Sequence, residues 1–349
     1  MNTLKLKLIS LIFLSVFLSS CTNLLYTSLD VLRPAKVAFN PNANNLLIVN
    51  NAVVQPVEYG HTTQLINTKP KKVLVSADSL GIFCISSLTE EMQSKAFFLN
   101  VNFLLETINN SGDFNTNQLL TSEKVKQLCL ENNSNVVLSL DNIKVYDDLS
   151  EYFDSQQNSF LASLEVKVET DWSVHYINSS KLTSVQFVDT VYWEAESYKR
   201  KNTMSQLPLR YDALIDAAIT AGKKSIDRFV PRWEKVDRYF YNPGNKLMRE
   251  AMDSVYVKNW KSAIDLWVSA YDSSKSKRIK SQAANNIAIA YEIIGDIDKA
   301  FEYATISYYM LDQLNLYDYE SYVRTMEYVN DLSQRKKEID ILKDQLGEK

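Results

Sequence analysis

An alternation of apolar and polar residues that begins at Phe160 constrains the fold more than any other feature of this sequence. Even-numbered positions from 162 to 176 are mostly apolar, and the odd-numbered positions between them are mostly charged. A period of two places successive side chains on opposite faces of a strand. A turn-forming run at 177–181 then returns the chain into a second alternating run that ends near Trp193. We therefore predict a long antiparallel hairpin with one solvated face.

Strand-like and helix-like segments alternate around this hairpin. Short apolar runs predict strands at 46–49, 97–101 and 135–140. Helical periodicity predicts helices at 76–94, from 121 onward and at 209–230. Residues 46–241 are therefore expected to form an α/β domain, a mixed sheet with packed helices, within an α+β fold.

Three details of the predicted helices can be tested. Ser76 or Asp78 is expected to cap the first helix, and Thr121 opens a capping-box-like start for the second. Gly222 lowers the helix propensity of the third helix, so we expect it to permit close packing of that helix on the sheet.

The periodicity becomes purely helical after the turn-forming run 242–245, which marks the best domain boundary. Residues 245–349 are expected to form an all-α domain with two helix pairs, whose small and large residues match the spacing of a tetratricopeptide repeat. The matching residues are Ala251, Trp260, Ala263, Ala288, Tyr291, Gly295 and Ala300. The 37 residues from Ala263 to Ala300 are close to the ~34-residue repeat. A generic helical hairpin is the alternative.

Stacked helix pairs leave a concave face lined by the first helix of each pair. Arg249, Asn285 and Glu292 fall on those first helices. We expect them to border a groove that binds a protein partner, and we expect Arg249 and Asn285 to lie outside the apolar core.

The first residues of the chain have the arrangement of a bacterial lipoprotein signal. Lys5 and Lys7 precede an apolar core at 8–18, and Leu18-Ser19-Ser20-Cys21 follows. The core is too short to span a bilayer, so residues 1–20 are predicted to be a cleaved signal peptide. Cys21 would then carry the lipid, with residues 21–45 as a tether. An ordinary secretory leader with a chance cysteine is the alternative.

The two remaining cysteines, Cys84 and Cys129, each fall within a predicted helix, on or beside its apolar face. An oxidising cell envelope would allow them to form a disulfide. Two separate buried thiols are equally compatible with the sequence.

Composition excludes several classes of function. The net charge is -4 and no basic block is present, which disfavours nucleic acid as a partner. Only His61 and His175 occur, without metal-ligand spacing, and the glycines form no phosphate-binding loop. We therefore expect no metal and no cofactor. His175 falls on the polar face of the hairpin, where a solvated side chain is expected.

Paired carboxylates are the remaining route to an enzyme. Asp147, Asp148, Glu151 and Asp154 follow the strand predicted at 135–140. A glycosidase uses two such groups, but a solvated acidic loop is the simpler interpretation. We therefore expect a protein that is not an enzyme.

The lipoprotein signal, the α/β pattern, the Arg232-Trp233 and Arg238-Tyr239 segment, and the run 283–292 with Gly295 occur together. In this combination the chain resembles an uncharacterised family of tetratricopeptide-containing lipoproteins of Bacteroidota. Its α/β part is also similar in element order to the curli-secretion lipoprotein and to lipoproteins that activate penicillin-binding proteins. Neither resemblance implies catalytic residues.

These observations predict a non-enzymatic, lipid-anchored protein of the cell envelope that acts as a protein-binding scaffold or adaptor. Thr22 and Asn23 follow Cys21 without an acidic run, which favours the periplasmic side of the outer membrane. The alternatives are a subunit of an oligomeric secretion or pore complex, and a glycan-processing enzyme.

Overall fold

The computed structural model describes residues 24–109, 112–177, 179–314 and 319–347. The predicted leader and Cys21 lie outside these described residues. The chain divides into two compact units, which are described separately below. The sheet unit comprises Pro34–Arg232 and the last residues from Asp344, and the helical unit comprises the residues up to Arg33 together with Trp233–Lys343. The predicted α+β class is confirmed, with a mixed sheet and helices followed by a helical region.

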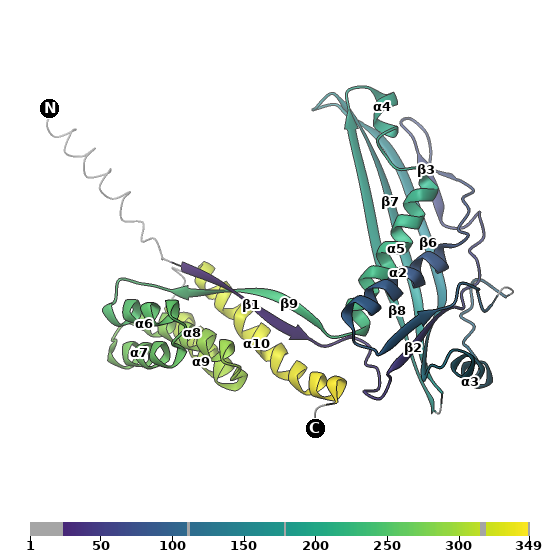
Figure 1. Ribbon diagram of the computed structural model, residues 1–349. Coiled ribbons are helices and arrows are strands. Elements are labelled where there is room, and N and C mark those ends of the chain that lie inside the picture. The colour runs from purple at the N-terminus through teal and green to yellow at the C-terminus, as the bar shows by residue number, and fades with distance from the viewer. Residues whose placement is uncertain (1–23, 110–111, 178, 315–318, 348–349) are drawn as a thin grey trace, which may run out of the picture. The chain divides into compact units, whose positions relative to one another are not determined.

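The sheet unit contains a mixed seven-stranded sheet among its described residues (Figure 1). Its strands are β2 (Asn45–Asn50), β3 (His61–Gln64), β4 (Lys71–Lys72), β5 (Asn100–Phe103), β6 (Val136–Asp154), β7 (Ser159–Tyr176) and β8 (Ser179–Ser197). Strand β6 organises the sheet because one of its edges pairs with β7 along the whole strand. Its other edge pairs in parallel with β2 near its start and with β3 near its end.

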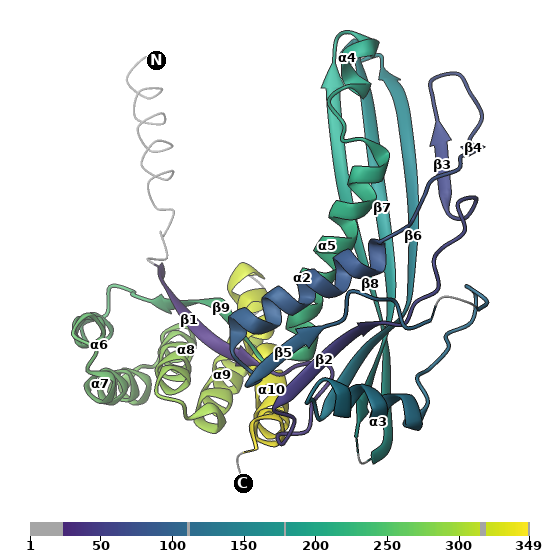
Figure 2. The same ribbon diagram turned by 45° about the vertical axis from the view of Figure 1, so that its right-hand side comes forward.

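Helices cover both faces of this sheet. Helices α2 (Leu80–Lys95) and α5 (Arg210–Phe229) lie on one face, as Figures 1 and 2 show, and α3 (Ser122–Glu131) lies on the other. Within β2, Leu46 and Ile48 pack toward α2 and α5, whereas Leu47 and Val49 pack toward α3. Burial on both faces explains why β2 is a continuous apolar run rather than an alternating one.

The predicted hairpin is confirmed as β7 and β8, which pair antiparallel from Phe160↔Ser197 to Tyr176↔Ser179. The even-numbered apolar side chains of β7 face the core and are buried: Ala162, Leu164, Val166, Val168, Trp172 and Val174. Strand β6 is longer than the predicted 135–140, because β7 continues to pair with it as far as Asp154. The short helix α4 (Arg200–Met204) follows β8.

The helix details are partly as predicted. The Thr121 side chain accepts a hydrogen bond from the Lys124 backbone N–H, so the predicted start of α3 is confirmed. Helix α2 instead starts after Ser79, which has φ 67° and makes no side-chain cap. The Ser76 hydroxyl accepts from the backbone N–H of Asp78 in the preceding turn, so neither residue caps the helix. Gly222 does permit a close approach, but to α2 rather than to the sheet.

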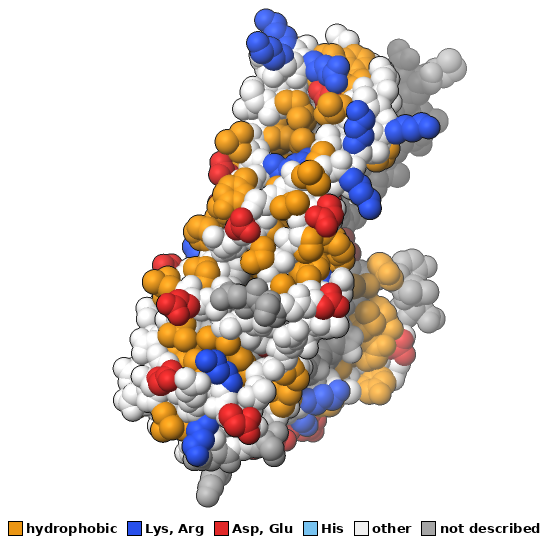
Figure 3. Space-filling view, turned by 90° about the vertical axis from the view of Figure 1, so that its right-hand side faces the viewer, with side chains coloured by type: hydrophobic (Ala, Val, Ile, Leu, Met, Phe, Trp, Pro, Cys, Tyr) orange, Lys and Arg blue, Asp and Glu red, His pale blue; other side chains and the backbone are white. Residues whose placement is uncertain are grey.

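One end of the sheet unit is rich in basic side chains. Figure 3 shows lysine and arginine gathered toward its upper end, where α4 lies in Figure 1, and Figure 2 shows β4 lower down beside β3. The exposed basic residues of these segments include Lys69, Lys71, Lys72, Lys199 and Lys201. Strand β4 is an edge strand, and lysines on an edge oppose pairing with a strand of another chain.

The helical unit contains a series of contacting helices. They are α6 (Lys246–Tyr256), α7 (Trp260–Ser273), α8 (Lys277–Ile293), α9 (Ile297–Asp312) and α10 (Tyr319–Leu346). Four small residues of the predicted repeat pattern are fully buried where these helices pack: Ala251, Ala263, Ala288 and Ala300. Gly295 has φ +87° in the turn between α8 and α9, a conformation that favours glycine. Trp260 and Tyr291 are half-buried and stack on Phe240 and Tyr303, respectively.

Two strands complete the helical unit, and the sequence did not suggest them as a pair. Strand β1 (Leu24–Arg33) pairs with β9 (Arg232–Tyr241), and the two run in opposite directions (Figure 1). Residues 24–33 therefore form part of a folded unit, whereas a tether was expected there. Segments this far apart in sequence give no local signal of pairing, which is why the strand was taken for a linker.

Strand β9 lies along α8 and is held there through its backbone. The Asn286 side chain accepts a hydrogen bond from the Tyr241 N–H at 2.8 Å and donates one to the Tyr241 carbonyl at 2.7 Å. The Asn285 amide donates to the Tyr239 carbonyl at 3.1 Å. The inner face of α8, where we expected a partner, is thus occupied by a strand of the same chain.

Candidate functional site

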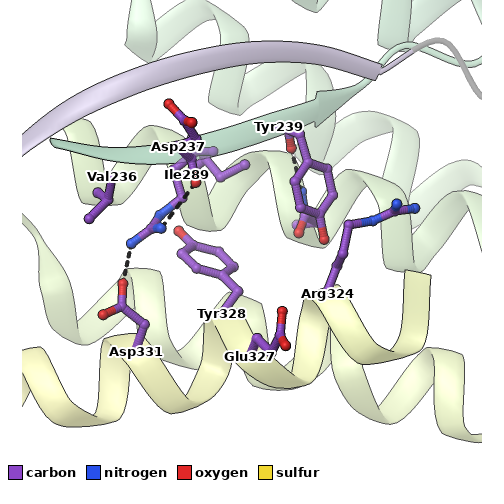
Figure 4. A pocket seen from close by; sticks show the side chains of 10 residues that line it. Val236, Asp237, Tyr239, Ile289, Arg324, Glu327, Tyr328 and Asp331 are labelled. Carbon is purple, nitrogen blue, oxygen red and sulfur yellow. Dashed lines mark hydrogen bonds and ion pairs between the residues drawn. The ribbon is translucent and has the colours of Figure 1, made fainter. Parts of the chain in front are cut away.

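A cavity of about 340 Å³ lies between β9, α8 and α10 in the helical unit. Figure 4 shows Tyr239 projecting from β9 toward Tyr328, Glu327 and Arg324 of α10, with Ile289 nearby. The full lining is Val236, Asp237, Arg238, Tyr239, Asn285, Ile289, Arg324, Glu327, Tyr328 and Asp331. The volume falls in the usual range for small binding sites. The lining is mostly polar, since five of the ten residues are charged and Val236 and Ile289 are the aliphatic ones.

One wall of the cavity is fixed by a buried ion network centred on Glu292. Its carboxylate accepts two hydrogen bonds from Arg238, at 2.8 and 2.9 Å, and one from the Tyr328 hydroxyl at 2.8 Å. Arg335 also binds Glu292, and Arg238 also binds Asp331. A buried charge is tolerated when it is paired and hydrogen-bonded in this way. The network therefore fixes β9 and α10 against α8.

Arg33 extends the network to β1. Its guanidinium binds Glu234 at 2.6 Å, Asp331 at 2.7 Å and Glu338 at 3.0 Å. Partial burial opposes ionisation of Asp331, but the hydrogen bond from Arg33 and the charge of Arg238 prevail and lower the pKa of Asp331. Burial and the neighbouring Glu292 charge raise the pKa of Tyr328 well above 10, so this tyrosine stays a hydrogen-bond donor.

Three residues that line the cavity have a buried polar atom without a hydrogen-bond partner among the described residues, the Tyr239 hydroxyl being one of these atoms. The Asn285 side chain is fully buried, yet its Oδ1 has no hydrogen-bond partner among the described residues. The Arg324 Nε also has none there, and its guanidinium lies 5.3 Å from the Tyr239 ring centroid. An unpaired buried polar atom is costly, so a bound group that supplies a donor to Asn285 and an acceptor to Arg324 would be stabilised.

The structure separates the three residues predicted to border a groove. Asn285 lines the cavity, although it is fully buried rather than outside the core as expected. Glu292 is buried in the ion network beside it. Arg249 is exposed on α6, where it donates to the Gly244 carbonyl, and it does not line the cavity.

The residues that sequence reasoning missed come from β9 and α10. Arg238 was noted only as part of a motif, and Arg324, Tyr328 and Asp331 were predicted only to lie in the all-α domain. The spacing of Arg324, Tyr328 and Asp331 along α10, four and then three residues, places them on one helix face. That spacing was the available signal, but their partners on other elements could not be identified from it.

Both histidines lie in buried clusters of the sheet unit. His61 on β3 contacts Asp147 on β6 through Nδ1, and the Arg210 Nε lies 3.2 Å from the same carboxylate. The side chains of His61 and Asp147 are completely buried, and Gln55 is 3.4 Å from the other ring nitrogen. This cluster joins β3, β6 and α5.

The second cluster contains His175, Ser139 and Asp141, which are 8%, 0% and 4% exposed. His175 was expected to be solvated, but β7 pairs with β6 here and its Nε2 lies 3.0 Å from the Ser139 hydroxyl. That hydroxyl donates to Asp141 at 2.7 Å. The carboxylate is thus bonded to the serine and not to the imidazole, which differs from a catalytic triad.

Burial lowers the pKa of His175 to about 4. We therefore expect its ring signals in NMR spectra to stay at the neutral position as the pH falls from 7 to 5, with the His175→Gln variant assigning the signals. Because the pKa is lower in the folded than in the unfolded state, the stability that the neutral ring provides is complete above about pH 6.5. This contribution to the stability of the folded state is lost as the pH falls toward 4, where the ring becomes protonated in the folded protein. Titration of the His175 signals near pH 6.5 would contradict this expectation.

The acidic residues expected in a solvated loop lie instead on β6, because β6 continues through them. Asp147 is held by His61 and Arg210, and Glu151 is buried and paired with Arg200 at 2.7 Å. The hydrogen bond from Arg200 lowers the pKa of Glu151. Both buried carboxylates therefore have cationic partners.

Several other features of the described residues bear on function. Cys84 and Cys129 are buried and free, so the two-thiol alternative holds. No group of three or more His, Cys, Asp or Glu side chains in the described ranges could hold a metal ion. Within the same ranges, none of the helices combines the length and the apolar character needed to cross a membrane.

The fold and the cavity define an α+β protein with a ligand-sized site in its helical unit. Residues 43–241 match a family described as Domain of unknown function (DUF8603), and because this match covers more than half of the sequence, the chain belongs to that family. Residues 249–334 match a second one, Domain of unknown function (DUF6340). None of the curated proteins matches the chain.

Solved structures add little to this assignment. One described as "Crystal structure of uncharacterized protein" is 11% identical and covers 55% of this chain and 95% of its own, with a TM-score of 0.23. An overlap this weak supports no inference about fold or function.

Proposed function

We propose that this protein is a non-enzymatic adaptor of the cell envelope, anchored by lipid on Cys21, that holds a protein partner at the cavity between β9, α8 and α10. The observation that supports it best is the unpaired Asn285 Oδ1, a fully buried acceptor on a residue that lines the cavity together with Arg324. A peptide backbone offers the N–H and the carbonyl that these two groups require.

The charges around the cavity favour a particular partner segment. Arg238 and Asp331 are already paired with each other and with other groups of the network. Asp237 and Glu327 are exposed at the cavity and leave an excess of negative charge. We therefore expect the bound segment to carry a lysine or arginine side chain.

The helical arrangement is compatible with the same proposal. Helices α6 to α9 carry the small and aromatic residues of two tetratricopeptide-like units, and stacked units of this kind form binding surfaces, although β9 occupies the inner face of α8 here. The buried, charge-paired state of Asp147 and Glu151 favours an adaptor over a glycan-processing enzyme. We further propose that the protein faces the periplasm from the outer membrane.

Replacement of Arg324 tests the partner site. Arg324→Ala is expected to weaken partner capture about tenfold or more, because a charge-assisted hydrogen bond contributes about 1.5–3 kcal/mol. Partners are cross-linked and purified with the tagged protein from native envelopes, and each is quantified by mass spectrometry.

Arg249→Ala is the matched control, because it removes the same side chain from an exposed position outside the cavity. It should capture partners as the unchanged protein does, and Arg324→Lys should retain part of the binding. If Arg324→Ala keeps its normal thermal stability and still captures every partner fully, the cavity is not the binding site.

A further inference from the structure

Strand β1 begins directly after the predicted lipid attachment point. Thr22 and Asn23 are the only residues between Cys21 and Leu24, the first residue of β1. We propose that the lipid holds the helical unit itself against the surface of a phospholipid bilayer, through a connection of two residues. This inference rests on the proposed anchoring at Cys21.

Strand β1 is integrated into the helical unit. Val31 is 2% exposed, and Leu24 and Leu25 pack against the core of the helices. Arg33, at the end of the strand, binds three carboxylates from β9 and α10. Ser28 also donates to Asp237 of β9 at 2.6 Å. A strand with these contacts is not a free linker.

The chain between Cys21 and β1 is short. Three residue steps join Cys21 to Leu24, and a fully extended chain spans about 3.3–3.6 Å per residue, or about 10 Å in all. A flexible tether over the predicted residues 21–45 would have a root-mean-square length of about 25–30 Å. The short connection therefore confines the helical unit to the membrane surface. A flexible tether over residues 21–45 would have allowed the unit to move away from it.

Exposed side chains near the start of β1 indicate which part of the helical unit faces the lipid. Tyr26 is 69% exposed near the start of β1, and its ring lies 6.5 Å from that of Tyr239. Arg324 of α10 contacts the same Tyr239 ring. Tyrosine is favoured at the boundary between lipid and water. The start of β1 and the first turns of α10 thus lie nearest the headgroups, and the proposed partner cavity lies beside them.

Energy transfer to the membrane tests this arrangement. A donor dye is attached to Glu320→Cys, an exposed position one turn before Arg324. Cys84 and Cys129 are buried, and burial raises the pKa of both thiols, so the new cysteine is labelled selectively. The purified, lipidated protein is placed in phosphatidylethanolamine and phosphatidylglycerol vesicles that contain a headgroup-labelled acceptor lipid.

Transfer is expected to be strong for the native connection. It should be mostly lost after insertion of a Gly-Ser linker of about 30 residues between Asn23 and Leu24, which adds about 30 Å. The matched control carries the same linker between Ser274 and Lys275, in the exposed connection from α7 to α8, and should keep the native transfer. Equal transfer with the linker at either position would overturn the inference, as would weak transfer in the native protein.

Membrane attachment is measured separately, so that the two proposals can fail independently. Cys21→Ala should move the protein from the membrane pellet to the soluble fraction, because the lipid provides the anchor. If Cys21→Ala stays in the pellet after a high-salt wash, lipid anchoring is wrong and the inference falls with it. If Cys21 is lipidated but energy transfer is unchanged by the linker between Asn23 and Leu24, only the placement of the helical unit at the membrane is wrong.

Discussion

Replacement of Glu292 by alanine is expected to destabilise the helical unit by about 3–5 kcal/mol, since breaking a buried ion pair leaves its partners charged and unpaired. Here the loss would affect Arg238, Arg335 and the Tyr328 hydroxyl together. Hydrogen exchange of the α8 and α10 amides measures the effect, because it reports on this unit separately from the sheet unit.

The exposed Glu302 of α9 provides the control for Glu292. Glu302→Ala removes the same side chain from a surface position and should change stability by at most about 0.5 kcal/mol. The loss of stability in Glu292→Gln should lie between the losses in Glu292→Ala and Glu302→Ala, because glutamine retains the shape of the side chain but not its charge. Equal exchange protection in Glu292→Ala and Glu302→Ala would show that the ion network does not hold the unit together.

Replacement of Gly222 by alanine is expected to destabilise the sheet unit by about 1–3 kcal/mol through overpacking. At a solvent-exposed helix position, replacing glycine by alanine increases stability by about 1 kcal/mol. The change in stability expected for Gly222→Ala therefore has the opposite sign to the change that helix propensity alone would give. The reason is geometric: a Cβ on Gly222 would lie closer than 3.0 Å to the Cys84 carbonyl oxygen and to the Ser87 hydroxyl of α2. Exchange of the α2 and α5 amides measures the outcome.

Lys223→Ala is the control on the same helix, because Lys223 is exposed and its replacement leaves the contact with α2 unchanged. It should leave exchange in α2 and α5 nearly as in the unchanged protein. A stabilising effect of Gly222→Ala would mean that α2 and α5 can separate at little cost, which would contradict the close packing of these helices.

The ion network also has a consequence for the proposed function. Glu292 and Arg238 fix the wall of the cavity, whereas Asn285 Oδ1 and Arg324 Nε have no hydrogen-bond partner among the described residues. A site with fixed walls loses less conformational entropy when it binds. Glu292→Ala should therefore disturb both the fold and partner capture, while Arg324→Ala should disturb capture alone.

Local patterns were sufficient to predict the elements of this protein. The period of two in β7 identified its buried face, from Ala162 to Val174, because strand geometry alternates side chains whatever lies beside them. Thr121 identified the start of α3 for a similarly local reason, since a cap binds a backbone group three residues away. The α+β class and the helical region after residue 245 followed from such periods.

Contacts between distant segments were decided only by the tertiary structure. Strand β1 pairs with β9, which lies about two hundred residues later in the sequence. Arg33 donates a hydrogen bond to Asp331, which lies 298 residues later. A single sequence contains no signal for such a pairing, so β1 was taken for a tether. Asn285 was expected at the surface for the same reason: nothing near it in sequence shows that β9 covers α8. The sequence determined which residues form strands and helices, because short-range geometry controls that choice, and tertiary packing alone determined which charges meet and where the cavity lies.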